Sequence, residues 1–226
     1  MNVSLRLVRF VLSVVVPLSF TCIAQAQPKA GDLDIYGSVG WQGGMSFDAS
    51  NYAHLHGDMD GAWMWGFGTG YHFSDKLSML FDFSFGSSSL GLTVPSTALT
   101  GTWRQTADYF NGRLNLEYSP HPAVLEPVLS GGIGFNNFRT AVPGAPPQTW
   151  CGPSFYGYWW CATGVPTYDQ TAFSWNIGGG LRWQASPSMF LKLMYTATWA
   201  DFHAVKGTPQ FNTLTLQIGG TMPQGF

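Results

Sequence analysis

Charged side chains are scarce in this chain. Asp, Glu, Lys and Arg together make up 10% of its 226 residues, whereas about 25% is usual for a soluble domain. The net charge of −2 at pH 7 provides no basic surface, so we expect no nucleic-acid partner. After the first 26 residues, no apolar run reaches the roughly 20 residues of a membrane-crossing helix. These shortages argue against a nucleic-acid-binding protein and against a helical membrane protein.

Aromatic residues and glycine are abundant instead. Aromatics make up 16% of the chain, with 10 Trp and 17 Phe, and there are 28 Gly. Few charges, many aromatics and much glycine are typical of a membrane β-barrel. A soluble β-sandwich is the alternative that composition alone leaves open.

The first residues have the pattern of an export signal. A basic start is followed by a mostly apolar stretch over residues 10–23 and by the small-x-small cleavage pattern Ala24-Gln25-Ala26. We therefore expect residues 1–26 to be a cleaved signal peptide. Residues 27–226 have the length of one domain, which we expect to be an outer-membrane β-barrel.

The strongest structural signal is an alternation of apolar with small or polar side chains. In the segment Leu-Ser-Met-Leu-Phe-Asp-Phe-Ser-Phe-Gly (77–86) every second residue is apolar, and residues 189–202 and 210–222 repeat the pattern. A period of two places the two sets on opposite faces of a strand. In a membrane barrel the apolar set meets lipid and the other set faces the lumen.

Eight segments of this kind can be drawn. We therefore predict an all-β fold, an eight-stranded antiparallel up-and-down transmembrane β-barrel. Each segment has the roughly 9–11 residues that a tilted strand needs to cross a bilayer. The connections alternate between long and short, as external loops and periplasmic turns do in such barrels. A soluble sandwich is not expected to show this alternation. The predicted strands are 33–42, 61–73, 77–87, 103–118, 125–139, 172–185, 189–202 and 210–222.

Aromatic residues fall near both ends of the predicted strands. Amphipathic rings prefer the two membrane interfaces, so this distribution predicts two aromatic belts. The belt near the long loops comprises Trp41, Trp63, Trp103, Phe138, Trp175 and Trp199, and the belt near the short turns comprises Tyr71, Phe73, Tyr118 and Trp183.

Three segments carry a family resemblance: Leu-Ser-Gly-Gly-Ile-Gly-Phe (129–135), Phe-Ser-Trp-Asn-Ile-Gly-Gly-Gly-Leu-Arg-Trp (173–183) and Ser-Pro-Ser-Met-Phe-Leu-Lys-Leu-Met-Tyr (186–195). With them, residues 33–226 resemble the OmpA-like and OmpX-like small outer-membrane β-barrels. The resemblance implies an outer-membrane location with both termini in the periplasm, and outer-membrane lipids and lipopolysaccharide as partners. It also implies contact with the barrel-insertion machinery, because such families often end on an aromatic residue and Phe226 is last here.

Seven charged side chains occupy strand positions whose parity should face the lumen. An eight-stranded barrel is only just wide enough for its own side chains, and an unpaired buried charge costs several kcal/mol. We therefore predict an ion-pair network that closes the bore, with each base beside an acid. A narrow conduction or substrate path is the alternative. The predicted members are Asp34, Asp82, Arg113, Glu117, Glu126, Arg182 and Lys192.

No catalytic arrangement emerges from these residues, since no Ser-His-acid set lies on the inward parity. The glycine clusters Gly66-x-Gly68-x-Gly70 and Gly178-Gly179-Gly180 lie within strands, whereas a phosphate loop needs a strand-to-helix turn. We therefore expect no catalytic residues and no cofactor.

Cys151 and Cys161 lie in the longest predicted external loop, residues 140–171. Two cysteines in one loop of an exported protein predict a disulfide, which would contribute about 3 kcal/mol to ordering the loop. The loop also displays aromatic side chains that suggest contact with a host surface or a glycan; a lid over the barrel mouth is an equal alternative. These side chains are Trp150, Phe155, Tyr156, Tyr158, Trp159 and Trp160.

The first predicted external loop, residues 43–60, contains the one cluster with metal-ligand chemistry. His54, His56, Asp58 and Asp60 alternate along it, which would place all four on one side of an extended segment. Short His/Asp runs are usually only solvated, so we expect no metal, with a divalent-metal site as the alternative.

These observations favour a non-enzymatic outer-membrane barrel that anchors external loops for envelope integrity, adhesion or surface recognition. A small pore or a conduit for small or apolar solutes, as in the OmpW-like barrels, is the second hypothesis. A lipid-modifying outer-membrane enzyme is less favoured, because His203 has no Ser partner within its own segment.

Overall fold

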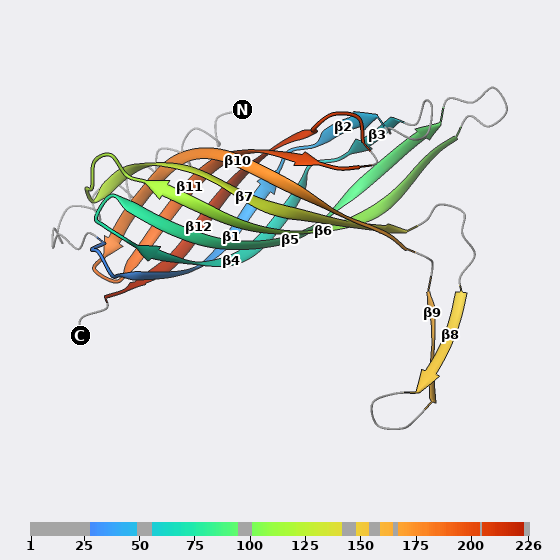
Figure 1. Cartoon of the computed structure of the whole chain (residues 1–226), viewed down its shortest axis with the longest axis horizontal. Helices are drawn as coiled ribbons and strands as arrows, with labels where there is room; N and C mark the ends of the chain where they lie inside the picture. The colour runs from blue at the N-terminus through green and yellow to red at the C-terminus, as the bar shows by residue number, and fades with distance from the viewer. Residues whose placement is uncertain are drawn as a thin grey trace, which may run out of the picture.

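The computed structural model describes residues 28–48, 56–94, 101–141, 148–153, 159–164, 167–203 and 205–223. Figure 1 shows an elongated barrel of tilted strands, with a separate two-stranded hairpin beyond one end. Among the described residues, no helix is long and apolar enough to cross a membrane.

Eight antiparallel strands form the closed barrel, as the alternation predicted. Neighbours along the chain pair with each other, and β1 pairs with β12 from Leu33 opposite Met222 to Gln42 opposite Thr213, which completes the circle. The strands are β1 (Leu33–Gln42), β4 (Ala62–His72), β5 (Leu77–Val94), β6 (Gly101–Tyr118), β7 (Leu125–Ala141), β10 (Thr167–Ser186), β11 (Met189–Asp201) and β12 (Gln210–Met222).

The two ends of the barrel differ in their connections. The end where β1 begins and β12 finishes carries the short connections 73–76, 119–124 and 187–188, and we call it the turn end. The opposite end, which we call the loop end, carries the connections 43–61, 95–100, 142–166 and 202–209, of which 43–61 and 142–166 are long. The sequence predicted that the long connections share one end, but 95–100 is no longer than the turn-end connection 119–124.

β5, β6, β7 and β10 continue farther at the loop end than predicted. β5 and β6 pair as far as Val94 and Gly101, so most of the predicted loop 88–102 is a two-stranded ribbon. β10 likewise begins at Thr167, which pairs with Ala141. Backbone hydrogen bonds between neighbours extend these ribbons past the region in which lipid enforces the alternation, so the sequence pattern does not mark them.

Two predicted loops contain short strands. β2 (Met45–Asp48) pairs with β3 (His56–Met59) in the register that β1 and β4 already share, so this pair continues the β1–β4 hairpin. β8 (Gln148–Pro153) and β9 (Trp159–Gly164) form a hairpin of their own, which Figure 1 shows standing beyond the loop end.

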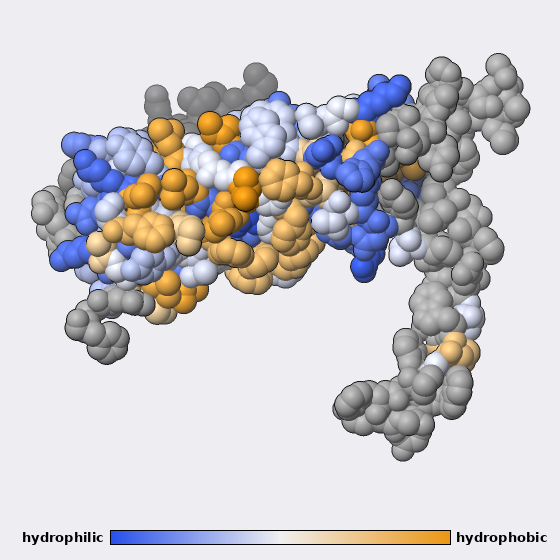
Figure 2. All heavy atoms as spheres, viewed as in Figure 1, coloured by the Kyte–Doolittle hydropathy of each residue, from blue (hydrophilic) through white to orange (hydrophobic). Residues whose placement is uncertain are grey.

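The outer face of the barrel is apolar over its middle. Along β11, Leu193 and Tyr195 are exposed, whereas the alternating residues Lys192 and Met194 are buried in the interior. Figure 2 shows hydrophobic residues gathered around the middle of the barrel and hydrophilic residues toward both ends. A band of this kind is the lipid-facing surface of a transmembrane barrel. A soluble sandwich would bury such residues between two sheets, so that alternative fails.

Aromatic rings pair on the outer face near both ends. Amphipathic rings prefer such interfacial positions. At the loop end Trp41 lies 5.5 Å from Trp63 and Trp175 stacks on Trp199 at 4.0 Å between centroids; at the turn end Tyr71 lies 5.2 Å from Phe73.

Phe138 does not belong to the loop-end belt, and its predicted place there was wrong. Its ring lies 5.1 Å from that of Phe202 and 6.0 Å from that of Tyr109, inside the barrel. Residue 138 has the inward parity of β7, with the buried Asn136 on the same face. The side chain of Trp103 lies outside the described part of the chain.

Candidate functional site

Asp34 is the centre of a buried cluster near the turn end of the lumen. Its carboxylate accepts hydrogen bonds from Arg182 Nη1 at 2.7 Å, Arg182 Nη2 at 3.2 Å and the Thr221 hydroxyl at 2.7 Å. His72 Nε2 lies 2.9 Å from the same carboxylate, and Glu126 Oε1 lies 3.6 Å from Arg182 Nε. The cluster therefore connects five strands, β1, β4, β7, β10 and β12.

Lys192 and Glu117 form a second buried ion pair, 2.8 Å long, that crosses the interior from β11 to β6. The Lys192 ammonium also lies 5.4 Å from the centre of the Tyr36 ring. Tyr36 donates a hydrogen bond to Asp82, which accepts a second one from Asn115 at 2.7 Å. The predicted lumen residues on these strands thus lie inside the barrel, in two clusters.

Arg113 departs from the prediction that every lumen base pairs with an acid. It makes no ion pair with the described carboxylates, and its Nε is buried without a hydrogen-bond partner. Asp82 stands opposite Arg113 in the β5–β6 ladder. Its oxygens are instead engaged by Tyr36 and Asn115, so the pairing that parity suggested does not form.

The sequence analysis did not assign His72 and Tyr36 to the lumen. His72 is buried against Asp34, and Tyr36 bridges Lys192 and Asp82. Both lie on the inward parity of their strands, β4 and β1. Parity alone would have found them if neutral and aromatic polar groups had been counted with the charged ones.

Neutral polar side chains line the interior between the charged clusters and the loop end. They are buried, and each has at least one side-chain nitrogen or oxygen atom without a hydrogen-bond partner. Buried polar atoms are normally satisfied, and Asn115 and Gln217, which lie nearer the turn end, carry unpartnered atoms as well. The side chains between the charged clusters and the loop end are Gln42, Asn111, Asn136, Ser174, Asn176 and Thr198.

An apolar cluster fills the interior at the loop end. Ala172, Ala200, Phe202 and Phe211 are buried together, and Phe138 packs against them. The charged clusters share the turn-end half of the interior with the buried Leu80 and Phe190, whereas the cluster at the loop end is apolar throughout.

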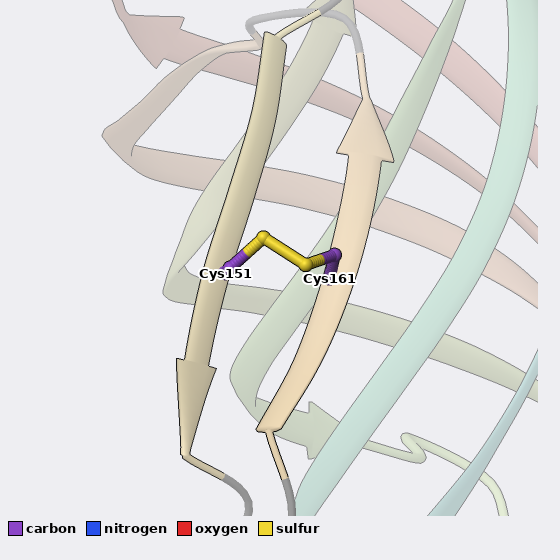
Figure 3. The surroundings of a disulfide bond; sticks show 2 residues. All are labelled: Cys151 and Cys161. Carbon is purple, nitrogen blue, oxygen red and sulfur yellow. A yellow bond between two sulfur atoms is a disulfide. The ribbon is translucent and has the colours of Figure 1, made fainter.

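The loop-end hairpin carries a disulfide, as predicted. Cys151 and Cys161 stand directly opposite each other in β8 and β9 and are bonded (Figure 3). Of the six aromatic residues assigned to surface contact, three lie outside the described residues, and the side chains of the other three are not described. The first three are Phe155, Tyr156 and Tyr158; the others, Trp150, Trp159 and Trp160, have their backbones in β8 and β9.

His56 lies between two carboxylates on the β2–β3 pair. Its Nδ1 is 2.9 Å from Asp48 Oδ1 and its Nε2 is 3.5 Å from Asp58 Oδ1. The hydrogen bond with Asp48, together with the charge of Asp58, raises the pKa of the exposed His56 imidazole. Asp60 instead lies 3.6 Å from Arg104, and His54 lies outside the described residues. Within the described ranges, no group of three His, Cys, Asp or Glu side chains could hold a metal ion.

Comparison with known proteins identifies the family. Residues 13–220 match the family described as "Outer membrane protein beta-barrel domain", whereas no curated protein sequence matches the chain. The outer membrane protein OprG from Pseudomonas aeruginosa has a similar structure, with a TM-score of 0.52 and 13% identity over 86% of this chain and 97% of OprG. Neisserial surface protein A (NspA) is similar with a TM-score of 0.53 and 11% identity over 82% of this chain and 96% of NspA. This chain therefore belongs to the outer-membrane protein β-barrel family.

Proposed function

We propose that this barrel is a non-enzymatic anchor that presents the β8–β9 hairpin outside the cell for adhesion or surface recognition. The hairpin is the observation that supports the proposal: it stands beyond the loop end (Figure 1), and the Cys151–Cys161 bond joins its two strands. A cross-linked hairpin has fewer open conformations. It therefore loses less conformational entropy when it binds a partner.

The proposal includes an orientation. The turn end, where β1 begins and β12 finishes, faces the periplasm, and the loop end faces the exterior. Short periplasmic turns and longer external loops are the usual arrangement of outer-membrane barrels. Residues 1–26 are then the export signal, and outer-membrane lipids and lipopolysaccharide surround the apolar band.

The interior favours an anchor over a conduit. Ion pairs between Arg182 and Asp34 and between Lys192 and Glu117 cross the turn-end half, and the apolar cluster around Phe202 occupies the loop end. An eight-stranded barrel has little room beyond its own side chains. We therefore expect no steady single-channel openings from the purified protein in planar bilayers; reproducible openings would support transport instead.

The recognition role is tested by removing the hairpin alone. In one variant, residues 148–164 are replaced by a Gly-Ser linker, and both proteins are reconstituted in lipid nanodiscs. Heat-dependent migration on gels checks that both barrels are closed, since a closed barrel has no free edge from which to unravel.

The probes are a panel of immobilised glycans and a monolayer of epithelial cells. We expect the unaltered barrel to bind at least one probe and the hairpin-less barrel to bind none above empty nanodiscs. Equal binding by the two proteins, or no binding by either, would remove the adhesion role and leave only structural anchoring in the envelope.

A further inference from the structure

We propose that Arg113 and the neutral side chains beside it form an internal binding site for a small monovalent anion, such as chloride or formate. This site lies inside the barrel and is independent of the recognition role assigned to the hairpin. It rests on an unpaired cation on β6 and on unpartnered hydrogen-bond donors on the next two strands of the sheet, β7 and β10.

Arg113 differs from the two other bases of the lumen. Arg182 and Lys192 have carboxylate partners at 2.7 and 2.8 Å, whereas Arg113 has none among the described residues. Its Nε is buried without a hydrogen-bond partner, although the residue as a whole is half-buried. A bound anion would supply a countercharge and an acceptor for this N–H group.

Arg113 lies beside Gly134 in the sheet. It stands opposite Gly134 on β7, and Gly134 stands opposite Ser174 on β10. A Cβ atom built on Gly134 would clash with the carbonyl oxygen of Gly112 and would lie 3.1 Å from Arg113 Cγ. A glycine at position 134 therefore leaves room for the start of the Arg113 side chain, next to β7 and β10.

Three buried side chains on β7 and β10 carry unpartnered hydrogen-bond donors. Asn136 lies on the inward face of β7, beside Gly134, and Ser174 and Asn176 lie on the inward face of β10. Their exposed fractions are 1%, 0% and 4%, and Asn136 Nδ2, Ser174 Oγ and Asn176 Nδ2 have no hydrogen-bond partner. A buried donor left unpaired is destabilising, because it has given up its hydrogen bonds to water. One anion placed among them accepts hydrogen bonds from these groups and from the guanidinium, and such charge-assisted bonds are the strong ones.

The surroundings restrict the class of anion. Asp82, opposite Arg113 in the β5–β6 ladder, repels a second negative charge, so a dianion such as hydrogen phosphate is disfavoured. Arg113 and the inward Ser130 are only half-buried, but an eight-stranded barrel leaves little interior space. A halide or a one-carbon carboxylate meets both restrictions.

The test is thermal unfolding of the full, detergent-purified barrel at constant ionic strength. Chloride or formate is exchanged stepwise for the bulky anion 2-(N-morpholino)ethanesulfonate. A ligand that binds only the folded state raises stability with its concentration. We expect the unfolding midpoint to rise with chloride and with formate, and Arg113→Gln to abolish that rise.

Arg139→Gln is the matched control, because Arg139 is exposed and pairs with Asp169 at 2.9 Å. It should retain the dependence on small anions. A dependence that persists in Arg113→Gln, or equal midpoints in all three anions for the unaltered barrel, overturns the proposal.

Bromide-soaked crystals of the unaltered barrel give a second reading that does not require the variant to fold. An anomalous peak within hydrogen-bond distance of the Arg113 guanidinium and of Ser174 or Asn176 is the expected result. Bromide only at other positions, or none in the barrel, also overturns the proposal.

Discussion

Arg182 on β10 donates hydrogen bonds to both carboxylate oxygens of Asp34 on β1, although the two residues are 148 positions apart in the sequence. Both side chains are almost completely buried, at 1% exposure each. Thr221 on β12 donates to the same carboxylate. The pair therefore lies next to the seam where the first and last strands close the barrel.

Replacing Arg182 with Ala should lower the free energy of unfolding by about 3 kcal/mol or more, because the Asp34 charge is left buried without its main partner. Equilibrium unfolding in urea, with the barrel in lipid vesicles, measures it. Arg139→Ala, which breaks the exposed pair with Asp169, should cost at most about 1 kcal/mol. A loss below about 0.5 kcal/mol for Arg182→Ala would indicate a water-filled bore and favour transport.

An arginine on the lipid-facing side of β11 should be costly. Leu193 is exposed on the outer face, and a charge placed there near the membrane midplane costs about 2–4 kcal/mol. The same unfolding measurement compares Leu193→Arg with Gln210→Arg, an exposed position at the loop-end start of β12. Similar, small losses for both would mean that the outer face does not contact lipid.

Epitope tags test the proposed orientation. A tag inserted at Asp75, in the turn between β4 and β5, should be inaccessible to antibody on intact cells. A tag at Pro146, outside the described residues, should be accessible. Permeabilised cells provide the control that both tags are present, and the reversed labelling pattern would invert the barrel in the membrane.

The backbone amides of the β2–β3 pair should become less protected from hydrogen exchange as pH rises. The pKa of His56 is raised in the folded protein, chiefly by Asp48, so the protonated imidazole stabilises the pair below the ordinary histidine pKa of about 6.5. That contribution is lost as pH rises through the raised pKa. Hydrogen exchange of the 45–48 and 56–59 amides, corrected for the intrinsic pH dependence of exchange, measures it. His56→Gln should remove the pH effect; if it persists, the source is another group.

Removing the disulfide should loosen the hairpin and leave the barrel unchanged. In Cys151→Ser/Cys161→Ser, the eight barrel strands keep their backbone hydrogen bonds, which do not involve the hairpin. The hairpin, without its cross-link, gains access to many more open conformations. Faster hydrogen exchange confined to β8 and β9, with an unchanged unfolding midpoint, is the expected result. Alkylation of the exported protein without reductant supplies the control, and two reactive thiols would contradict the bond itself.

The sequence by itself determined the barrel and its membrane-crossing strands. Each such strand has lipid on one side and a narrow interior on the other, so its apolar and polar residues must alternate. The sequence shows this alternation, and β1 and β12 have the predicted bounds. Where lipid no longer separates the faces, the pattern weakens. The ribbon of β5 and β6 beyond residue 88 was therefore not predicted.

Only the tertiary structure decided which lumen residues meet. Parity places Asp34, Arg113 and Arg182 inside, but it does not say which side chains face each other across the bore. That depends on the stagger between strands and on barrel closure, which bring Arg182 to Asp34 and leave Arg113 beside Gly134. An alternation with a period of two shows on which face of its strand a side chain lies. It does not show how far that side chain is from another one across the barrel.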